Sequence, residues 1–184
     1  MINHIDVGTV LRRTVCDLYS NLVTRSTGAA VRTEIELQLD AAPGRALTII
    51  DYTHVGLLDF SCADEIVAKL LMRSGGARTA PEDYFLFRGV SESHLDAIEA
   101  VLDRHGLALV AEARNGAPTL VGAVGDSERS VWEMVFRLGR VAVGDLASAS
   151  GLTSIDAEAV LETLCRRRLL MRMDDEYATV GGYS

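Results

Sequence analysis

The sequence lacks any long apolar run, although 48% of its 184 residues are hydrophobic. No stretch of about 18 consecutive apolar residues occurs, so the sequence predicts no membrane-spanning helix. The first residues, Met1 to Asp6, do not form a basic stretch leading into an apolar run, and we expect no signal peptide. These absences favour a cytoplasmic protein without a membrane partner.

Cysteine is scarce as well. Cys16, Cys62 and Cys165 are far apart, and each stands among apolar neighbours. An odd, scattered set of this kind is neither a disulfide framework nor a metal-binding motif. We therefore expect three buried thiols in a reducing compartment, and we predict neither a metal nor another cofactor.

Lysine is nearly absent, since Lys69 is the only one and the other 17 of the 18 cationic side chains are arginines. The formal net charge is -8. Up to Val124 there are 11 cations against 16 carboxylates, and after it 7 against 10, so neither part is basic. A nucleic-acid binder usually carries a basic patch, and its absence disfavours DNA as a partner.

The common catalytic templates are missing too. The motifs GxSxG, GxxxxGKS/T, GxGxxG and HExxH do not occur. The four histidines (His4, His54, His94 and His105) are isolated from one another and from the cysteines. The sequence therefore predicts a protein that is not an enzyme.

Helical and strand patterns alternate through the first two thirds of the chain. Asp6 is a plausible N-cap for a helix over residues 7–23, which precedes the α/β part. The expected elements after it are a helix with Val31, Ile35 and Leu39 on one face, ended by Pro43-Gly44, a strand over 46–51, a helix over 61–72, a strand over 84–87, a helix over 92–104, and a hairpin of 107–113 and 119–124 around Asn115-Gly116. This order indicates an α/β fold with a mixed sheet: parallel strands closed at one edge by a hairpin.

The last third has a different organisation. Helices are expected over 128–138, 143–148 and 154–168, followed by an alternating hairpin of 169–173 and 177–180. Three helices followed by a hairpin are typical of the winged form of helix-turn-helix. We therefore divide the chain into an N-terminal helix (1–23), an α/β domain (24–124) and a C-terminal winged-helix domain (128–184).

The stretch from Asp51 to Leu70, DYTHVGLLDFSCADEIVAKL, resembles the STAS domain of anti-sigma factor antagonists. In both, a strand ends in a loop that presents a serine at the start of a helix. Together with Thr24 to Arg32, the sequence Ser61-Cys62-Ala63-Asp64-Glu65 is similar to the divergent STAS-like family. The resemblance covers about residues 24 to 124.

This resemblance implies a bacterial regulatory protein that docks onto a protein partner, such as a kinase or an anti-sigma-like ATPase. The implied docking residues are Arg25, Arg32, Asp51, Asp59, Ser61, Asp64 and Glu65. Ser61 is a candidate phosphoacceptor, because a phosphate at a helix start places about two negative charges in a contact surface. Phe60 stands where the usual acceptor serine of the family would be, and Ser61 is alternatively a simple N-cap.

Two further alternatives stay open. Arg25 and Arg32 either pair with Glu34 or Glu36 at a solvated helix start, or face the carboxylates of Asp59, Asp64 and Glu65. The apolar stripe of the first expected helix either packs on the sheet or forms a homodimer seam. That stripe consists of Val7, Leu11, Val15, Leu18 and Leu22.

The winged-helix pattern suggests a competing function, a DNA-binding transcription regulator whose α/β part senses a signal or dimerises. The expected buried side of the reader helix is Ile155, Ala159, Val160 and Leu164, which leaves Asp156, Glu158 and Glu162 outward. The wing tip, Asp174-Asp175-Glu176, is acidic as well, and like charge opposes binding to phosphates. The candidate contacts to a DNA backbone are Arg166, Arg167, Arg168 and Arg172.

Overall fold

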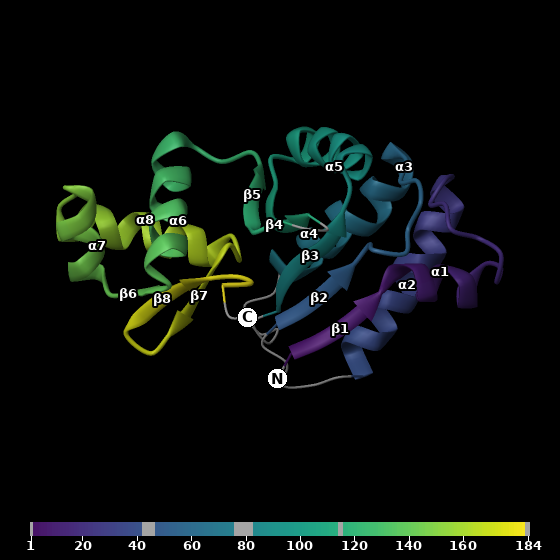
Figure 1. Cartoon of the computed structure of the whole chain (residues 1–184), viewed down its shortest axis with the longest axis horizontal. Coiled ribbons are helices and arrows are strands. Elements are labelled where there is room, and N and C mark those ends of the chain that lie inside the picture. The colour runs from purple at the N-terminus through teal and green to yellow at the C-terminus, as the bar shows by residue number, and fades with distance from the viewer. Residues whose placement is uncertain (1, 42–46, 76–82, 114–115, 183–184) are drawn as a thin grey trace.

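The computed structural model describes residues 2–41, 47–75, 83–113 and 116–182 (Figure 1). Its larger sheet has five strands in the order β1-β2-β3-β4-β5, of which the first four are parallel and β5 is antiparallel to β4. The strands are β1 (Ile2–Asp6), β2 (Leu47–Asp51), β3 (Tyr84–Val90), β4 (Ala108–Ala113) and β5 (Pro118–Gly122). The predicted α/β class with a mixed sheet and a hairpin edge is confirmed. Asn115 of the predicted turn and Pro43-Gly44 lie outside the described residues.

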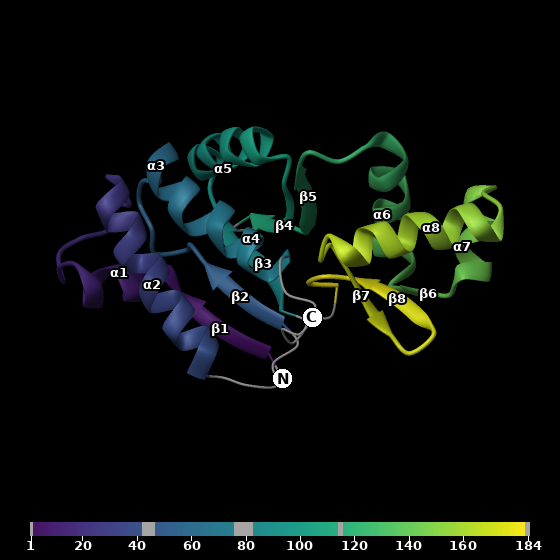
Figure 2. The ribbon, with the colours of Figure 1, turned by 180° about the vertical axis from the view of Figure 1, so that it is seen from behind.

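The helices between these strands share one face of the sheet, because every parallel connection steps to the next strand in the same direction (Figures 1 and 2). They are α1 (Val7–Thr14), α2 (Arg25–Ala41), α3 (Phe60–Ala63), the π-helical turn η1 (Asp64–Ala68), α4 (Lys69–Gly75) and α5 (Glu92–His105). The predicted buried face of α2 is confirmed at Val31, Ile35 and Leu39. The π-helical turn was not predicted, and such turns are frequent at functional sites.

The N-terminal prediction is only partly correct. Asp6 does cap a helix, since its side chain accepts a hydrogen bond from the backbone of Thr9, but that helix ends at Thr14 instead of residue 23. Residues 2–6 form the edge strand β1, which the helical interpretation of residues 1–23 missed. Because only Ile5 of this strand is fully buried, its apolar pattern is too weak to reveal a strand.

The residues after α1 follow an irregular path along the loop that leaves β2. The backbone of Leu22 bridges to Leu58, and the N–H of Leu22 donates to the carbonyl of Leu57 at 2.7 Å. The expected helical stripe is therefore divided: Val7, Leu11 and Leu22 are buried, whereas Val15 and Leu18 are exposed. The same path exposes Cys16, so the prediction of three buried thiols is wrong there, although Cys62 is buried and Cys165 is partly buried.

The C-terminal part consists of three helices and a three-stranded sheet with the order β6-β8-β7. Its elements are α6 (Asp126–Leu138), β6 (Arg140–Val141), α7 (Val143–Ser150), α8 (Ser154–Arg166), β7 (Leu170–Met173) and β8 (Glu176–Thr179). The three helices and the hairpin were predicted, and β6 was not. Among the described residues, no helix combines the length and apolar composition needed to cross a membrane.

The expected buried side of α8 is only partly correct, since Leu164 is buried and Val160 is partly buried as predicted, but the other two residues are not. Its buried residues are Ala157, Leu161 and Leu164, whereas Ile155 is 80% exposed and Ala159 is also exposed. The first turn of α8 therefore extends beyond the core, and the buried stripe is shifted by two residues from the one predicted at this end. The acidic residues of α8 do point outward, as expected.

The C-terminal part packs on the second face of the larger sheet. One apolar cluster contains Leu86 and Val110 of that sheet together with Trp132 and Leu164 of the C-terminal helices. The guanidinium of Arg168 lies 5.5 Å from the centroid of the Tyr84 ring. Figures 1 and 2 show this part at one end of the molecule, beside β5, and the α1–α2 connection at the opposite end.

Candidate functional site

Asp59 ties together the starts of two helices. Its Oδ1 accepts hydrogen bonds from the backbone N–H of Cys62 and the hydroxyl of Ser61, both at 2.8 Å. Its Oδ2 accepts a bond of 3.1 Å from the backbone N–H of Thr24, just before α2. Burial alone would raise the pKa of the Asp59 carboxyl, but the hydrogen bonds from Cys62, Thr24 and Ser61 outweigh it and hold that pKa below its ordinary value.

The cap of α3 is Asp59, so the interpretation of Ser61 as the N-cap is wrong. A carboxylate two residues earlier reaches the unpaired N–H of Cys62, and it also accepts the bond that the Ser61 hydroxyl donates. Ser61 is partly buried at the second position of the helix. Its assignment as a phosphoacceptor stays a prediction.

Asp64 and Glu65, in η1, form a charge network with the first residue of α2. Nη1 of Arg25 donates to Asp64 at 2.9 Å and to Glu65 at 2.8 Å. Glu65 is only 3% exposed, and it also accepts a hydrogen bond of 2.6 Å from the ammonium of Lys69. His105, from the end of α5, contacts Asp64 at 2.7 Å.

The electrostatics of both carboxyls follow from these contacts. The hydrogen bond with His105 is the main reason why the pKa of Asp64 is lowered, and Arg25 adds to it. Burial opposes ionisation of Glu65, but the hydrogen bonds from Lys69 and Arg25 outweigh it and lower its pKa as well.

The two interpretations of the arginines are resolved differently. Arg25 faces Asp64 and Glu65, as the second interpretation predicted. Arg32 does both: its Nη1 pairs with Glu36 at 2.9 Å, and its Nε lies 3.5 Å from Glu65. This network fixes α2 against η1, and the buried Glu65 therefore serves to position its neighbours instead of offering a surface for contact.

Asp51 lies at the carboxyl end of β2, and its hydrogen-bond partners are not those of Asp59. Its Oδ2 contacts Nε2 of His4 at 2.9 Å, and its Oδ1 accepts a bond of 2.8 Å from the N–H of Thr53. The neighbouring strand repeats the arrangement, with Asp6 and His54 at 3.0 Å. These aspartate–histidine pairs join residues 47 or 48 positions apart, so sequence spacing did not reveal them. The signal for them was the location of both aspartates at the ends of adjacent parallel strands.

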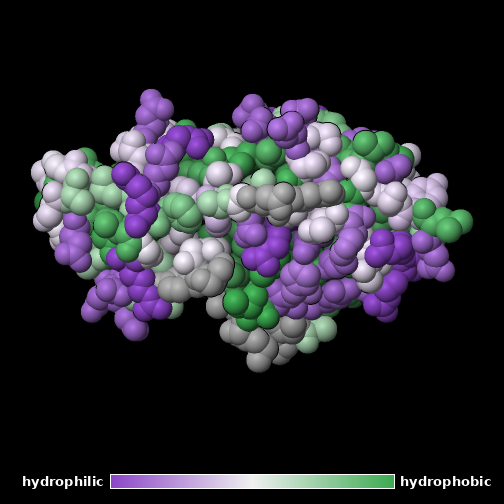
Figure 3. Space-filling model, in the orientation of Figure 1, coloured by the Kyte–Doolittle hydropathy of each residue, from purple (hydrophilic) through white to green (hydrophobic). Residues whose placement is uncertain are grey.

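Exposed apolar side chains gather beside Asp59, on the two loops that the Leu22–Leu58 bridge joins. We call this surface the apolar loop patch; it consists of Val15, Leu18, Tyr19, Val23, Leu57 and Phe60. Leu18 is 92% exposed and Leu57 is 54% exposed. In Figure 3 a hydrophobic projection stands at the right-hand end, where Figure 1 places the α1–α2 connection. This patch was not predicted from the sequence, because the helical periodicity placed Val15 to Val23 in a helix.

The loops of this patch hold each other firmly. The N–H of Gly56 donates to the carbonyl of Ser20 at 2.7 Å, and the N–H of Leu57 donates to the side chain of Asn21 at 3.1 Å. His94 supports the second loop from below: its Nδ1 accepts from the N–H of Ser91, so its Nε2–H donates to the Gly56 carbonyl at 3.0 Å. The apolar side chains are therefore presented on a backbone with fixed hydrogen bonds.

The arginines suggested as DNA contacts have different partners within the chain. Arg167 pairs with Glu128 at 2.7 Å and donates to the carbonyl of Ala123, while Arg168 lies over Tyr84. Arg172 lies over its own hairpin, 5.9 Å from the centroid of Tyr177. Arg166, which is exposed, donates to Thr163 at 2.9 Å. Arg167 and Arg168 therefore serve the contact between the two parts of the chain.

Gly28 permits the close contact between α2 and the Asp59 helix start. A Cβ at this position would lie 2.9 Å from the Cα of Cys62 and 3.1 Å from the Cβ of Glu65. We expect Gly28→Ala to lower the free energy of unfolding by about 1–3 kcal/mol, although alanine is the better helix former. Gly144→Ala in α7, where a Cβ meets nothing within 4 Å, is the control and should be neutral or stabilising. Urea unfolding of both variants measures the two changes in the free energy of unfolding. If both substitutions stabilise the chain, the close contact between α2 and the Asp59 helix start is contradicted.

Asp59 should also make the stability depend on pH. Because its pKa is lower in the folded chain, ionised Asp59 stabilises the fold above the ordinary aspartate pKa of about 3.9, and this contribution disappears as the pH falls through the folded value. Asp59→Asn should therefore be less stable than the unaltered chain at neutral pH, and the difference should narrow below about pH 4. Urea unfolding across this pH range measures the difference in stability. Glu99→Gln, at an exposed position of α5, is the control. A difference that does not change with pH would contradict the assigned hydrogen bonds.

Within the described ranges, no group of three or more His, Cys, Asp or Glu side chains is arranged to hold a metal ion. Comparisons of the chain with protein-family models, with curated proteins and with solved structures found no match.

Proposed function

We propose that this chain is a non-enzymatic bacterial regulatory protein that acts by binding a protein partner through the apolar loop patch and the adjoining helix start at Asp59 and Ser61. The observation that carries the proposal is the patch itself. Five of its large exposed apolar residues lie on two hydrogen-bonded loops, and the sixth, Phe60, begins α3 beside them. Exposed apolar patches mark interaction sites. We interpret the part with the five-stranded sheet as a STAS-like module and the C-terminal part as a winged helix, an architecture that is consistent with the proposal.

The docking surface in this proposal differs from the set of residues first expected. Glu65 is buried, and the partly exposed Arg32 lies 3.5 Å from it, so both act as positioning groups. Asp51 contacts His4 and Thr53 instead of the Asp59 group. The side chains that a partner would contact are the apolar loop patch, with Asp59, Ser61 and Arg25 beside it. Apolar contacts at the centre with polar groups at the edge are the usual anatomy of a protein interface.

Ser61 remains the candidate switch within this surface. Its hydroxyl is 2.8 Å from the Asp59 carboxylate, so a phosphate there would bring about two more negative charges against that carboxylate. Repulsion would break the bond that Asp59 accepts, and with it the tie between α2 and α3. A kinase partner of the kind that the family resemblance implies fits this regulation, and the proposed location of the protein is the cytoplasm.

DNA binding is the second candidate, and the charge distribution opposes it. Asp156, Glu158 and Glu162 are exposed on α8, and the exposed wing tip is acidic as well. Two of the four arginines proposed as backbone contacts face the first part of the chain instead. A titration of DNA binding against salt separates the candidates, because phosphate contacts must weaken steeply as salt rises. DNA binding that weakens steeply with salt would favour the second candidate function. No DNA binding at low salt would rule that function out.

The protein-docking proposal is tested by placing charge in the patch. The double substitution Leu18→Asp with Leu57→Asp should abolish capture of the partner from a lysate while the far-ultraviolet circular dichroism stays unchanged. Leu37→Asp on α2 is the matched control, because Leu37 is 59% exposed but lies outside the patch. Equal recovery of the same proteins by all three forms would refute the docking surface.

A second copy of the chain is the other occupant that this test must recognise. If the chain forms a homodimer through the patch, replacing Leu18 and Leu57 by aspartate should halve the mass measured by light scattering. That result would identify a second copy of the chain as the occupant of the patch. An unaltered chain that is monomeric would instead favour a different protein as the occupant.

A further inference from the structure

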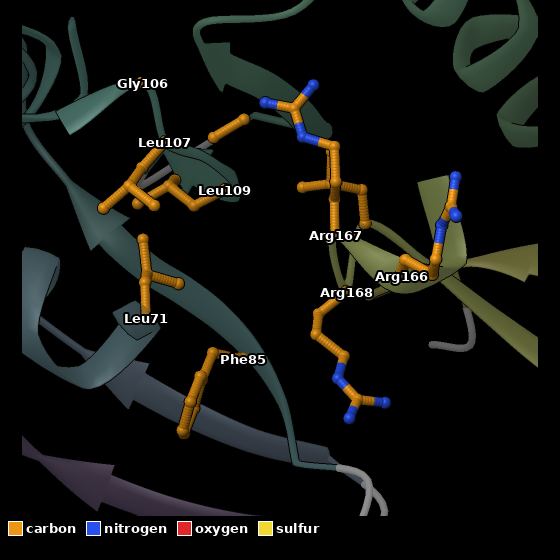
Figure 4. A pocket seen from close by; sticks show the side chains of 10 residues that line it. Leu71, Phe85, Gly106, Leu107, Leu109, Arg166, Arg167 and Arg168 are labelled. Atoms are coloured by element: carbon orange, nitrogen blue, oxygen red, sulfur yellow. The ribbon is translucent and has the colours of Figure 1, made fainter. Parts of the chain in front are cut away.

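A small cavity lies at the junction of the two parts of the chain. Its volume is about 130 Å³, and both parts line it. The first part contributes Leu71 from α4, Phe85 from β3 and residues 106–109, which include the start of β4. The second part contributes Arg166, the last residue of α8, and the three residues after it, 167–169. Figure 4 shows Leu71, Phe85, Leu107 and Leu109 on one side and Arg167 and Arg168 on the other.

The apolar side of this cavity belongs to the core beneath the helices. Phe85 and Leu109 are members of that core cluster, and Leu71 and Leu107 are partly buried against it. The core therefore reaches the surface between the ends of α4 and α5, where the turn after α8 adjoins it. An apolar cavity of about 150 Å³ accommodates a benzene molecule, so this one suits a group of about that size.

The opposite side is lined by three successive arginines. In Figure 4 the guanidinium groups of Arg167 and Arg168 lie at the margins of the cavity, whereas that of Arg166 points away from it. Arg168 has a backbone φ of +61°, a conformation that favours glycine over any residue with a side chain. An arginine at this position therefore carries a conformational cost that glycine would avoid, and it supplies a cation beside the cavity.

We propose that this junction cavity binds a small carboxylate with an apolar body, such as an arylcarboxylate. The ring would occupy the space between Leu71, Leu107 and Leu109, and the carboxylate would contact the guanidinium of Arg168 at the margin of the cavity. Carboxylates are the anions that guanidinium groups bind with the best geometry. Because this ligand touches both parts of the chain, its binding stabilises their contact and makes the junction a sensor of its concentration.

The test uses the full chain with labelled leucine methyl groups and phenylacetate as the probe. Phenylacetate should shift the methyl signals of Leu71, Leu107, Leu109 and Leu169, and leave the exposed Leu18 and Leu138 unchanged. Phenylacetamide, which has the same shape without the charge, should bind about tenfold more weakly. No shifts, shifts at exposed leucines only, or equal binding of the two probes would overturn the proposal.

Two variants sharpen the assignment. Arg168→Gly should remove the preference for phenylacetate over phenylacetamide, a change that loss of packing alone would not produce. Leu107→Trp should fill the cavity and abolish binding of both probes. Unchanged discrimination in the arginine variant would overturn the role of the Arg168 guanidinium, and the titration of the unaltered chain decides the matter if Leu107→Trp does not fold.

Discussion

Glu65→Ala is expected to lower the free energy of unfolding by about 3 kcal/mol. The carboxylate is 3% exposed and contacts Arg25, Lys69 and Arg32 at 2.8, 2.6 and 3.5 Å. Removal of this anion leaves cations from α2 and α4 next to one another without their common partner. It also opens a void at the contact between α2 and η1, where Glu65 lies. Urea unfolding followed by circular dichroism measures the loss.

Two further variants separate charge from packing at this position. Glu65→Met fills the same volume without the charge and should recover part of the stability, since apolar replacements of buried ions are often well tolerated. Glu99→Ala, on the exposed side of α5, should change stability by less than about 0.5 kcal/mol. A loss for Glu65→Ala no larger than that of Glu99→Ala would contradict the positioning role of Glu65.

Trp132→Ala is expected to cost about 3–5 kcal/mol, the largest loss in the C-terminal part. The indole is 2% exposed and stacks on Phe136, with centroids 5.7 Å apart and planes at 2°. Its Nε1–H donates to the carbonyl of Leu169 at 3.1 Å, in the turn that adjoins the larger sheet. The substitution therefore removes a large apolar volume and a buried hydrogen bond together.

Trp132→Phe is the matched control for this prediction. It retains an aromatic ring but loses the indole N–H, so it should cost about 1–3 kcal/mol, less than alanine. Because Trp132 is the only tryptophan, circular dichroism must follow the variants, while tryptophan fluorescence follows the unaltered chain. Equal losses for alanine and phenylalanine would contradict the importance of the packed ring.

Most of the elements could be predicted from sequence periodicity because their apolar faces are complete. The face of α2 with Val31, Ile35 and Leu39 and the β4–β5 hairpin are examples. Periodicity failed where only part of an element is buried. Edge strand β1 buries Ile5 alone, and the first turn of α8 projects Ile155 into solvent.

The candidate site could be predicted in part, because capping and charge are local properties. The motif around Ser61 located the helix start to within two residues, but Asp59 forms the cap, and the Ser61 hydroxyl donates to its carboxylate. The contacts of Arg25 with Asp64 and Glu65 cross about 40 residues, so only the fold decides between them and nearer carboxylates. The apolar loop patch could not be predicted because it depends on where α1 ends. Val15 and Leu18 continue the helical spacing of apolar residues although the helix has ended at Thr14.

Protein docking through the apolar loop patch is tested most directly by a photoreactive amino acid placed at single positions in living cells. The side chain replaces Leu57 in one form and the equally exposed Leu37 in the other. We predict covalent adducts with a partner protein from position 57 and none from position 37. The absence of adducts at position 57, or equal yields at the two positions, would contradict the account.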